Sequence, residues 1–212
     1  MERIRKSSLV AVVVLLLFLW LGREVRGNRT LAFDTAVRGT VHGWASVPLT
    51  WLMVGTTQLG APWVLIVVTL LAGWRFSVKG HRRVAAVLAI STIGVAALEE
   101  SLKTVYQRIR PVAFFGYDEP MTYSFPSGHA TTCLCFYGLL AVIVTQWIAS
   151  PRRRRIVWII TVLLVALIGF SRVYLGVHYP TDVLGGYALG AAWIIGVVRI
   201  ASPIGGKPLR PS

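Results

Sequence analysis

Two long apolar runs, separated by a short polar segment, occupy the last third of the chain. The first run reads IVWIITVLLVALIGF (156–170), the segment reads SRVYLGVHYPT (171–181), and the second run reads DVLGGYALGAAWIIGVVRI (182–200). A helix that crosses a bilayer needs about 20 mostly apolar residues, and fewer when flanking side chains reach the interface. Each run therefore predicts a membrane-spanning helix, and the segment between them places polar side chains at one membrane surface.

Further apolar runs of the same kind precede these two, at 9–21, 61–76, 84–103 and 127–149. Over all 212 residues, 55% are hydrophobic and 14% are charged, whereas soluble domains carry about 25% charged residues. This composition argues against a disordered chain and against a water-soluble globule. We therefore expect an all-α polytopic membrane protein with six transmembrane helices, forming a single membrane-embedded domain over residues 1–212.

The N-terminal 60 residues are expected to form an anchor followed by interfacial helices. The first apolar run follows three basic residues, as the core of a signal peptide also does. The residues after it, LGREVR (21–26), show no small-residue cleavage pattern, which favours a retained anchor. Residues 28–60 interleave apolar and charged side chains, and this pattern predicts short amphipathic helices at the interface rather than a seventh span.

The net charge of +14 is distributed unevenly between the two sides of the expected spans. Of the 22 Lys and Arg residues, 14 lie on the side that holds both termini and 8 lie on the other side. Because cytoplasmic loops are enriched in Lys and Arg, we expect both termini to be cytoplasmic. The PRRRR run (151–155) then determines topology, and nucleic acid is not an expected partner.

The sequence gives no indication of a metal or disulfide framework. Cys133 and Cys135 lie two residues apart in an apolar run, where a helix would point them to different faces. No partner residues recur at the spacing of zinc ligands, and no carboxylate cluster suits Mg²⁺. We therefore predict neither a disulfide nor a metal site.

Basic and hydroxyl side chains gather at three span ends that face the expected non-cytoplasmic side. Lys103, Arg110 and Arg172 supply three cations there, and a guanidinium group matches the oxygens of a phosphate. Ser127 and Gly128 begin an apolar helix, whose free N–H groups and dipole form an anion site. These residues predict a phosphate-binding site, and they belong to the segments KTVYQRIRP (103–111), PSGH (126–129) and SRVYLGVHYPTD (171–182).

Two histidines and one carboxylate in these segments suit phosphoryl transfer in two steps, which needs a nucleophile and an acid or base. Asp182 lies four residues after His178 and is close enough to fix the tautomer of its ring, so His178 is the expected nucleophile. His129 lies beside a helix N-terminus, where we expect it to protonate the leaving oxygen and later to activate water.

Other charged residues near these segments have simpler interpretations. Glu99 lies four residues before Lys103, so it is either the partner of a helical ion pair that positions Lys103 or simply an interfacial residue. Arg108 is expected to be an interfacial anchor, and His42 and His81 are expected to be ordinary surface residues.

The patterns Lys-x6-Arg-Pro (103–111), Pro-Ser-Gly-His (126–129) and Ser-Arg-x5-His-x3-Asp (171–182) resemble the three-part signature of the type-2 phosphatidic acid phosphatase superfamily. The resemblance implies a metal-independent phosphatase that needs no cofactor and passes through a phosphohistidine. It also implies His178 as nucleophile, His129 as acid and base, and Asp182 as the residue that orients His178. The phosphate would be bound by Lys103, Arg110, Ser127, Gly128 and Arg172.

The sequence thus predicts a lipid phosphatase in the cell membrane that acts at the extracytoplasmic face. Phosphatidic acid, phosphatidylglycerophosphate and polyprenyl diphosphates are the substrates that the resemblance implies, and the oligomeric state is not predicted. A phosphotransferase with an alcohol or sugar acceptor remains an alternative. A non-catalytic lipid-binding or transport protein is a second alternative, against which the complete set of His129, His178 and Asp182 argues.

Overall fold

Helices account for most of the described chain. The computed structural model describes residues 2–117 and 121–201, with the backbone alone for residues 2–8. No strand occurs within these residues, so the all-α prediction is confirmed for them. The helices are α1 (Glu2–Arg26), α2 (Leu31–His42), α3 (Val47–Gln58), α4 (Pro62–Val78), α5 (Arg82–Tyr106), α6 (Gly128–Thr145), α7 (Pro151–Tyr174) and α8 (Pro180–Ala201).

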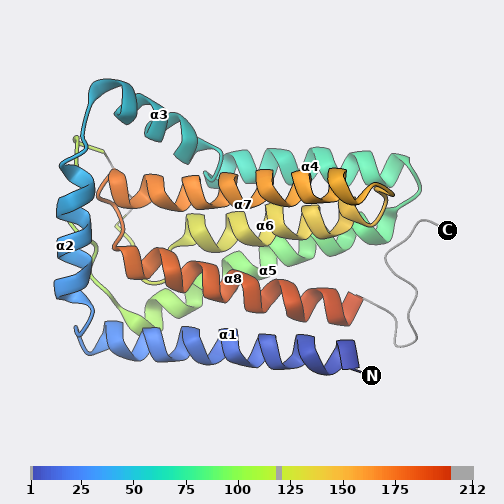
Figure 1. The fold of residues 1–212 in the computed structure, drawn as a ribbon, viewed down its shortest axis with the longest axis horizontal. Coiled ribbons are helices and arrows are strands. Elements are labelled where there is room, and N and C mark those ends of the chain that lie inside the picture. The colour runs from blue at the N-terminus through green and yellow to red at the C-terminus, as the bar shows by residue number, and fades with distance from the viewer. Residues whose placement is uncertain (1, 118–120, 202–212) are drawn as a thin grey trace.

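The helices α1 and α4 to α8 run along the long axis of the molecule, whereas α2 lies across one end of the bundle (Figure 1). Helix α6 packs against α5, α7 and α8, and its buried side chains include Phe136, Leu139 and Ile143. The contact between α6 and α8 depends on small residues, since a Cβ atom on Gly186 would lie 2.7 Å from the carbonyl oxygen of Ser127. Glycine at this position therefore brings the start of α8 against the start of α6.

Four of the described helices, α5 to α8, are long and apolar enough to cross a membrane. Helices α3 and α4 meet at a bend of 48° and reach that length and apolarity only as a pair, which makes up to five candidate spans in the part of the chain described. Each of the six apolar runs predicted from the sequence lies mostly within one helix, namely α1, α4, α5, α6, α7 or α8.

Several helix boundaries differ from the predicted runs, and two of them lie at the connection between α6 and α7. Helix α6 ends at Thr145 rather than at residue 149, and α7 begins at Pro151 rather than at residue 156. Ser150 precedes α7 and accepts a hydrogen bond from the Arg153 N–H, and Pro151 occupies the first helical turn. These capping residues start the helix within the basic run, where hydropathy alone gives no signal.

The three polar segments lie at the same end of the bundle. The last turns of α5 and α7 and the first turns of α6 and α8 meet there, beside α2 (Figure 1). The opposite end holds the start of α1 and the end of α8, together with the basic clusters before α5 and at the start of α7. Lys207 and Arg210, which belong to the 14 basic residues assigned to this side, lie outside the described residues.

Candidate active site

Most of the predicted site residues line one cavity of about 690 Å³, which we call the main cavity. They come from helices α5, α6 and α7 and from the connections before α6 and α8. Ser127 and Asp182 do not line the cavity and lie behind its wall. The residues predicted from the sequence that do line it are Glu99, Lys103, Arg110, Gly128, His129, Arg172 and His178.

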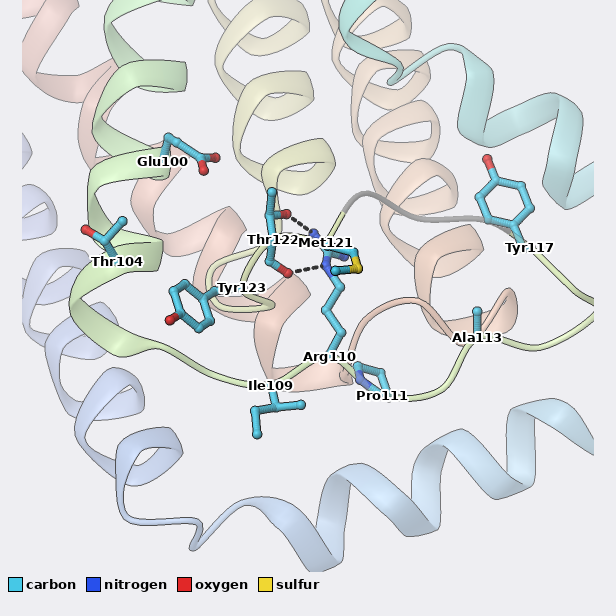
Figure 2. A pocket seen from close by; sticks show the side chains of 10 residues that line it. All are labelled: Glu100, Thr104, Ile109, Arg110, Pro111, Ala113, Tyr117, Met121, Thr122 and Tyr123. Carbon is cyan, nitrogen blue, oxygen red and sulfur yellow. Dashed lines mark hydrogen bonds between the residues drawn. The ribbon is translucent and has the colours of Figure 1, made fainter.

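Arg110 lines both the main cavity and a second cavity of about 670 Å³, the outer pocket, as do Glu100, Tyr117 and Thr122. Its Nε atom donates to the Thr122 carbonyl oxygen at 2.8 Å, and its Nη2 atom donates to Thr122 Oγ1 at 3.0 Å (Figure 2). Its Nη1 atom lies 3.0 Å from His178 Nε2. Burial lowers the pKa of Arg110, while the charge of Asp182 opposes this shift. Arg110 is therefore a fixed cation directed at the imidazole.

Lys103 lies beside two carboxylates of its own helix. Its Nζ atom is 2.7 Å from Glu99 Oε1 and 3.3 Å from Glu100 Oε2. The Glu99 carboxylate also lies against the first residue of α6, because a Cβ atom on Gly128 would be 3.0 Å from Glu99 Oε1. Glu99 thus forms the helical ion pair, which places Lys103 at the N-terminus of α6.

Arg172 is buried at the end of α7 and is held by a residue that the sequence did not reveal. Its Nη1 atom donates to Thr57 Oγ1 of α3 at 2.6 Å, and Thr57 is itself fully buried. The break that follows α3 brings the chain close to His129, since a Cβ atom on Gly60 would lie 2.9 Å from His129 Cδ2. The bend between α3 and α4 therefore contributes to the cavity wall.

His178 and Asp182 face each other across the first turn of α8. His178 Nδ1 lies 3.3 Å from Asp182 Oδ2, and Arg110 occupies the other side of the ring at Nε2. An arginine can only donate, so the proton of a neutral imidazole is on Nδ1 and the lone pair is on Nε2. Burial lowers the pKa of His178 to about 3, although Asp182 opposes the shift. At neutral pH His178 is therefore an uncharged imidazole with its lone pair directed into the cavity.

Asp182 Oδ2 has two further partners. The backbone N–H of Tyr179 donates to it at 2.8 Å, and the Ser124 hydroxyl donates to the same oxygen. Ser124 lies outside the three segments singled out in the sequence, and its side chain is fully buried. A serine two residues before a Pro-Ser-Gly-His motif carries no signal that would separate it from a loop residue.

The structure corrects two expectations. Arg108 is not an interfacial anchor, because its Nη1 atom lies 2.6 Å from Asp182 Oδ1 and its Nη2 atom lies 2.6 Å from Asp34 Oδ2. The N–H of Ser127 is not available to an anion, because it donates to the Asp182 carbonyl oxygen at 3.0 Å. The anion site at the start of α6 therefore consists of the N–H groups from Gly128 onward.

The main cavity also has an apolar arm that reaches away from the charged residues. Its walls there are formed by side chains of α4 and α5, including Ile66, Leu70, Ala89, Ile93 and Ala96. Within residues 2–117 and 121–201, no three His, Cys, Asp or Glu side chains are grouped to hold a metal ion. The cavity thus combines cations and imidazoles at one end with an apolar groove at the other.

Comparisons with known proteins give consistent matches. The model of the PAP2 superfamily matches residues 83–204. Phosphatidylglycerophosphatase B of Bacillus subtilis is 33% identical over 182 residues, which cover 84% of this chain and 88% of that protein. An undecaprenyl-diphosphatase of Sulfolobus acidocaldarius is 32% identical over 190 residues, covering 86% of each chain. The crystal structure of a transmembrane PAP2-type phosphatidylglycerolphosphate phosphatase from Bacillus subtilis superimposes with a TM-score of 0.83 at 29% identity, covering 90% of this chain and 94% of that one.

Proposed function

The chain belongs to the PAP2 superfamily, and from that premise we propose that it is a multi-pass membrane enzyme that hydrolyses a phosphate monoester or diphosphate of a lipid. The observation that carries the proposal is the shape of the main cavity. Its charged end suits a phosphate, and its apolar arm between α4 and α5 suits a hydrocarbon chain. One molecule that satisfies both ends is a lipid phosphate.

The proposal includes six spans and a defined orientation. Helices α1 and α4 would add to the four long apolar helices, with α2 lying along the membrane surface. The basic clusters before α5 and at the start of α7 lie at the end opposite to the main cavity, which favours that end as the cytoplasmic one. The reaction would then take place at the extracytoplasmic face of the cell membrane.

In the first chemical step, His178 Nε2 would attack the terminal phosphorus. The N–P bond forms as the bond from this phosphorus to the leaving oxygen breaks, and protonated His129 donates a proton to that oxygen, which is the lipid oxygen of a monoester or the bridging oxygen of a diphosphate. Asp182 accepts the Nδ1–H hydrogen bond, which strengthens as the ring becomes positive. Arg110 now bonds to His178 Nε2, so the arriving phosphate would have to take its place and accept the guanidinium N–H groups.

In the second step, water would attack the phosphohistidine. His129, deprotonated by the first step, takes a proton from this water, the N–P bond breaks, and His178 returns to its neutral form. Lys103, Arg110, Arg172 and the N–H groups at the start of α6 would stabilise the charge on the phosphoryl oxygens in both steps. Over the whole cycle, the proton that His129 gives to the leaving oxygen is replaced by the proton that it takes from water. Both histidines therefore return to their starting protonation states.

Phosphate release by the detergent-purified protein tests this proposal, measured in EDTA with phosphatidic acid, phosphatidylglycerophosphate and undecaprenyl diphosphate. We expect the wild type to release phosphate from at least one of them and His178→Ala to be slower by about 10⁴-fold or more. His81→Ala is the matched control, because His81 lies between α4 and α5 at the far end of the bundle. It should retain wild-type activity.

Three outcomes would contradict the proposal. Activity that persists in His178→Ala would remove the assigned nucleophile. Wild-type protein that consumes the lipid phosphate only when an alcohol or sugar is added, with the phosphoryl group recovered on that acceptor, would make the protein a phosphotransferase. A wild type that binds these lipids without turning them over would favour the non-catalytic alternative.

A further inference from the structure

A closed group of charges lies behind His178 and outside both cavities. It consists of Asp34 from α2, Arg108 from the loop after α5, and Thr181 and Asp182 from the first turn of α8, and we call it the Asp34 cluster. Asp34 and Asp182 are fully buried, and the Arg108 side chain is 9% exposed. None of the three catalytic segments contains Asp34.

Both carboxylate oxygens of Asp34 have partners within this cluster. Its Oδ1 atom accepts the backbone N–H of Thr181 at 3.0 Å, and its Oδ2 atom accepts the Thr181 hydroxyl at 2.7 Å. The same Oδ2 atom lies 2.6 Å from Arg108 Nη2. Asp34 thus caps the N-terminus of α8 from another helix and holds one side of the Arg108 guanidinium.

The other side of the guanidinium holds Asp182. Arg108 Nη1 lies 2.6 Å from Asp182 Oδ1 and donates to Thr181 Oγ1 at 2.8 Å. The guanidinium carbon also lies 4.0 Å from the ring centre of Tyr179. Asp182 Oδ1 is therefore occupied by Arg108, which leaves Oδ2 to face His178, Ser124 and the Tyr179 N–H.

The charges of the cluster depend on one another. Two buried carboxylates share one guanidinium, and a buried carboxylate that loses its cation is strongly unfavourable. Without Asp34, Arg108 loses one of the two carboxylates that hold its guanidinium. Without Arg108, both carboxylates lose their common counterion, and Asp182 is free to rotate away from His178.

We propose that Asp34, acting through Arg108, is a positioning residue for the reaction: it fixes the carboxylate of Asp182 and the start of α8, and thereby the direction of the His178 ring. This inference rests on the proposed function, in which His178 is the nucleophile. Helix α2 then belongs to the catalytic machinery, although it carries no residue that touches the main cavity.

The variants Asp34→Asn, Arg108→Gln and Arg108→Lys test the inference. We expect kcat to fall about 10-fold in Asp34→Asn and about 100-fold in Arg108→Gln, by analogy with the losses of about 10- to 100-fold found for partners that orient metal-ligating side chains. Arg108→Lys keeps the cation and should lie between Arg108→Gln and the wild type. KM should stay within about 2-fold, because the phosphate would contact Lys103, Arg110 and Arg172 instead.

Two inhibitors distinguish a loss of His178 orientation from a general loss of phosphate binding. Inorganic phosphate reports ground-state binding, and its Ki should stay within about 2-fold in all three variants. Vanadate imitates the five-coordinate transition state bonded to His178, so its Ki should rise in proportion to the loss of kcat/KM. The double variant Asp34→Asn with Arg108→Gln should be no slower than Arg108→Gln alone, because the two residues act as one unit.

Glu24→Gln is the matched control. Glu24 also forms an ion pair with an arginine, Arg29, but this pair connects the end of α1 to the turn before α2 and makes no contact with Asp182. Its removal should leave kcat and both Ki values within about 2-fold, as expected for a surface ion pair. If Asp34→Asn does not fold, Asp34→Glu keeps the charge and should show the same pattern with a smaller loss.

Three results would overturn the inference. The first is a wild-type kcat in both Asp34→Asn and Arg108→Gln. The second is an equal weakening of phosphate and vanadate binding in these variants. The third is a loss of kcat in the double variant that equals the product of the two single losses. His178→Ala is measured in parallel to identify which claim has failed. If His178→Ala is inactive while the Asp34 and Arg108 variants behave like wild type, only the inference fails, whereas an active His178→Ala removes the proposed function as well.

Discussion

The arginines at the site end of the bundle differ in where they lie relative to the main cavity. Arg110 and Arg172 border the main cavity and hydrogen-bond to the hydroxyl groups of Thr122 and Thr57, which are neutral. Arg108 lies outside the cavity and is held between two carboxylates. Lys103 also lines the cavity, although it is paired with the carboxylates of Glu99 and Glu100. Position relative to the cavity, more than the residue type or its partner, would therefore separate phosphate binding from positioning.

The Asp182→Asn variant disrupts the Asp34 cluster and should have the largest effect on activity. Asparagine cannot neutralise Arg108, and its amide can turn the wrong group toward His178 Nδ1, so we expect kcat to fall by about 10³ to 10⁴-fold. Breaking a buried ion pair should also lower the free energy of unfolding by about 3 to 5 kcal/mol. Steady-state kinetics and thermal melting in detergent measure the two effects.

We expect Asp182→Asn to lose both activity and stability, because Asp182 orients His178 and also belongs to the buried Asp34 cluster. If Asp182→Asn lost stability but kept kcat within about 10-fold of wild type, Asp182 would hold the fold without orienting the imidazole.

The Arg172→Gln variant removes an arginine that borders the main cavity instead. Glutamine can still bond to Thr57 but brings no charge to the cavity, so we expect kcat/KM to fall by about 10² to 10³-fold. Phosphate inhibition should weaken with it, in contrast to the Asp34 and Arg108 variants. A fall in kcat with unchanged phosphate inhibition would place Arg172 with the positioning residues.

The Ala96→Phe variant tests the apolar arm of the main cavity. A phenyl ring at this position would fill part of the groove between α4 and α5, and we expect KM for a long-chain lipid to rise about 10-fold. A short-chain phosphate ester should be unaffected. Ala97→Phe, at an exposed neighbouring position that does not line the cavity, is the control and should leave both substrates unchanged.

The smallest effect concerns the dependence of stability on pH. The pKa of His178 is lowered to about 3 by burial, so the unfolded chain takes up a proton near pH 6.5 and the folded protein does not. The contribution of neutral His178 is complete above about pH 6.5 and is lost as the pH falls toward about 3. The melting temperature should therefore drop by a few degrees between pH 7 and pH 5, and by less in His178→Gln. Equal drops in both proteins would contradict the buried neutral imidazole.

The parts of this arrangement that the sequence predicted are local ones. An apolar run of span length predicts a helix because the bilayer requires it, and all six runs lie in helices. The pair of His178 and Asp182, four residues apart, and the pair of Glu99 and Lys103 could be expected for the same reason, since both lie within about one turn of chain.

The parts that escaped prediction join distant segments. Arg108 and Asp34 are separated by 74 positions, and Arg172 and Thr57 by 115, so nothing in the spacing links them. A lone aspartate in an amphipathic helix and an arginine at a span end have ordinary surface explanations, and only the packing of α2 against the start of α8 shows that these two side chains are buried together.

The most direct test of the central claim is to trap the phosphorylated protein. Wild-type enzyme mixed with a lipid labelled with ³²P in its phosphate should, on rapid quenching, carry acid-labile and base-stable label on a peptide that contains His178. The label should form more slowly in Asp182→Asn and be absent from His178→Ala. Wild-type turnover with label on a different residue, or label that persists in His178→Ala, would contradict the account.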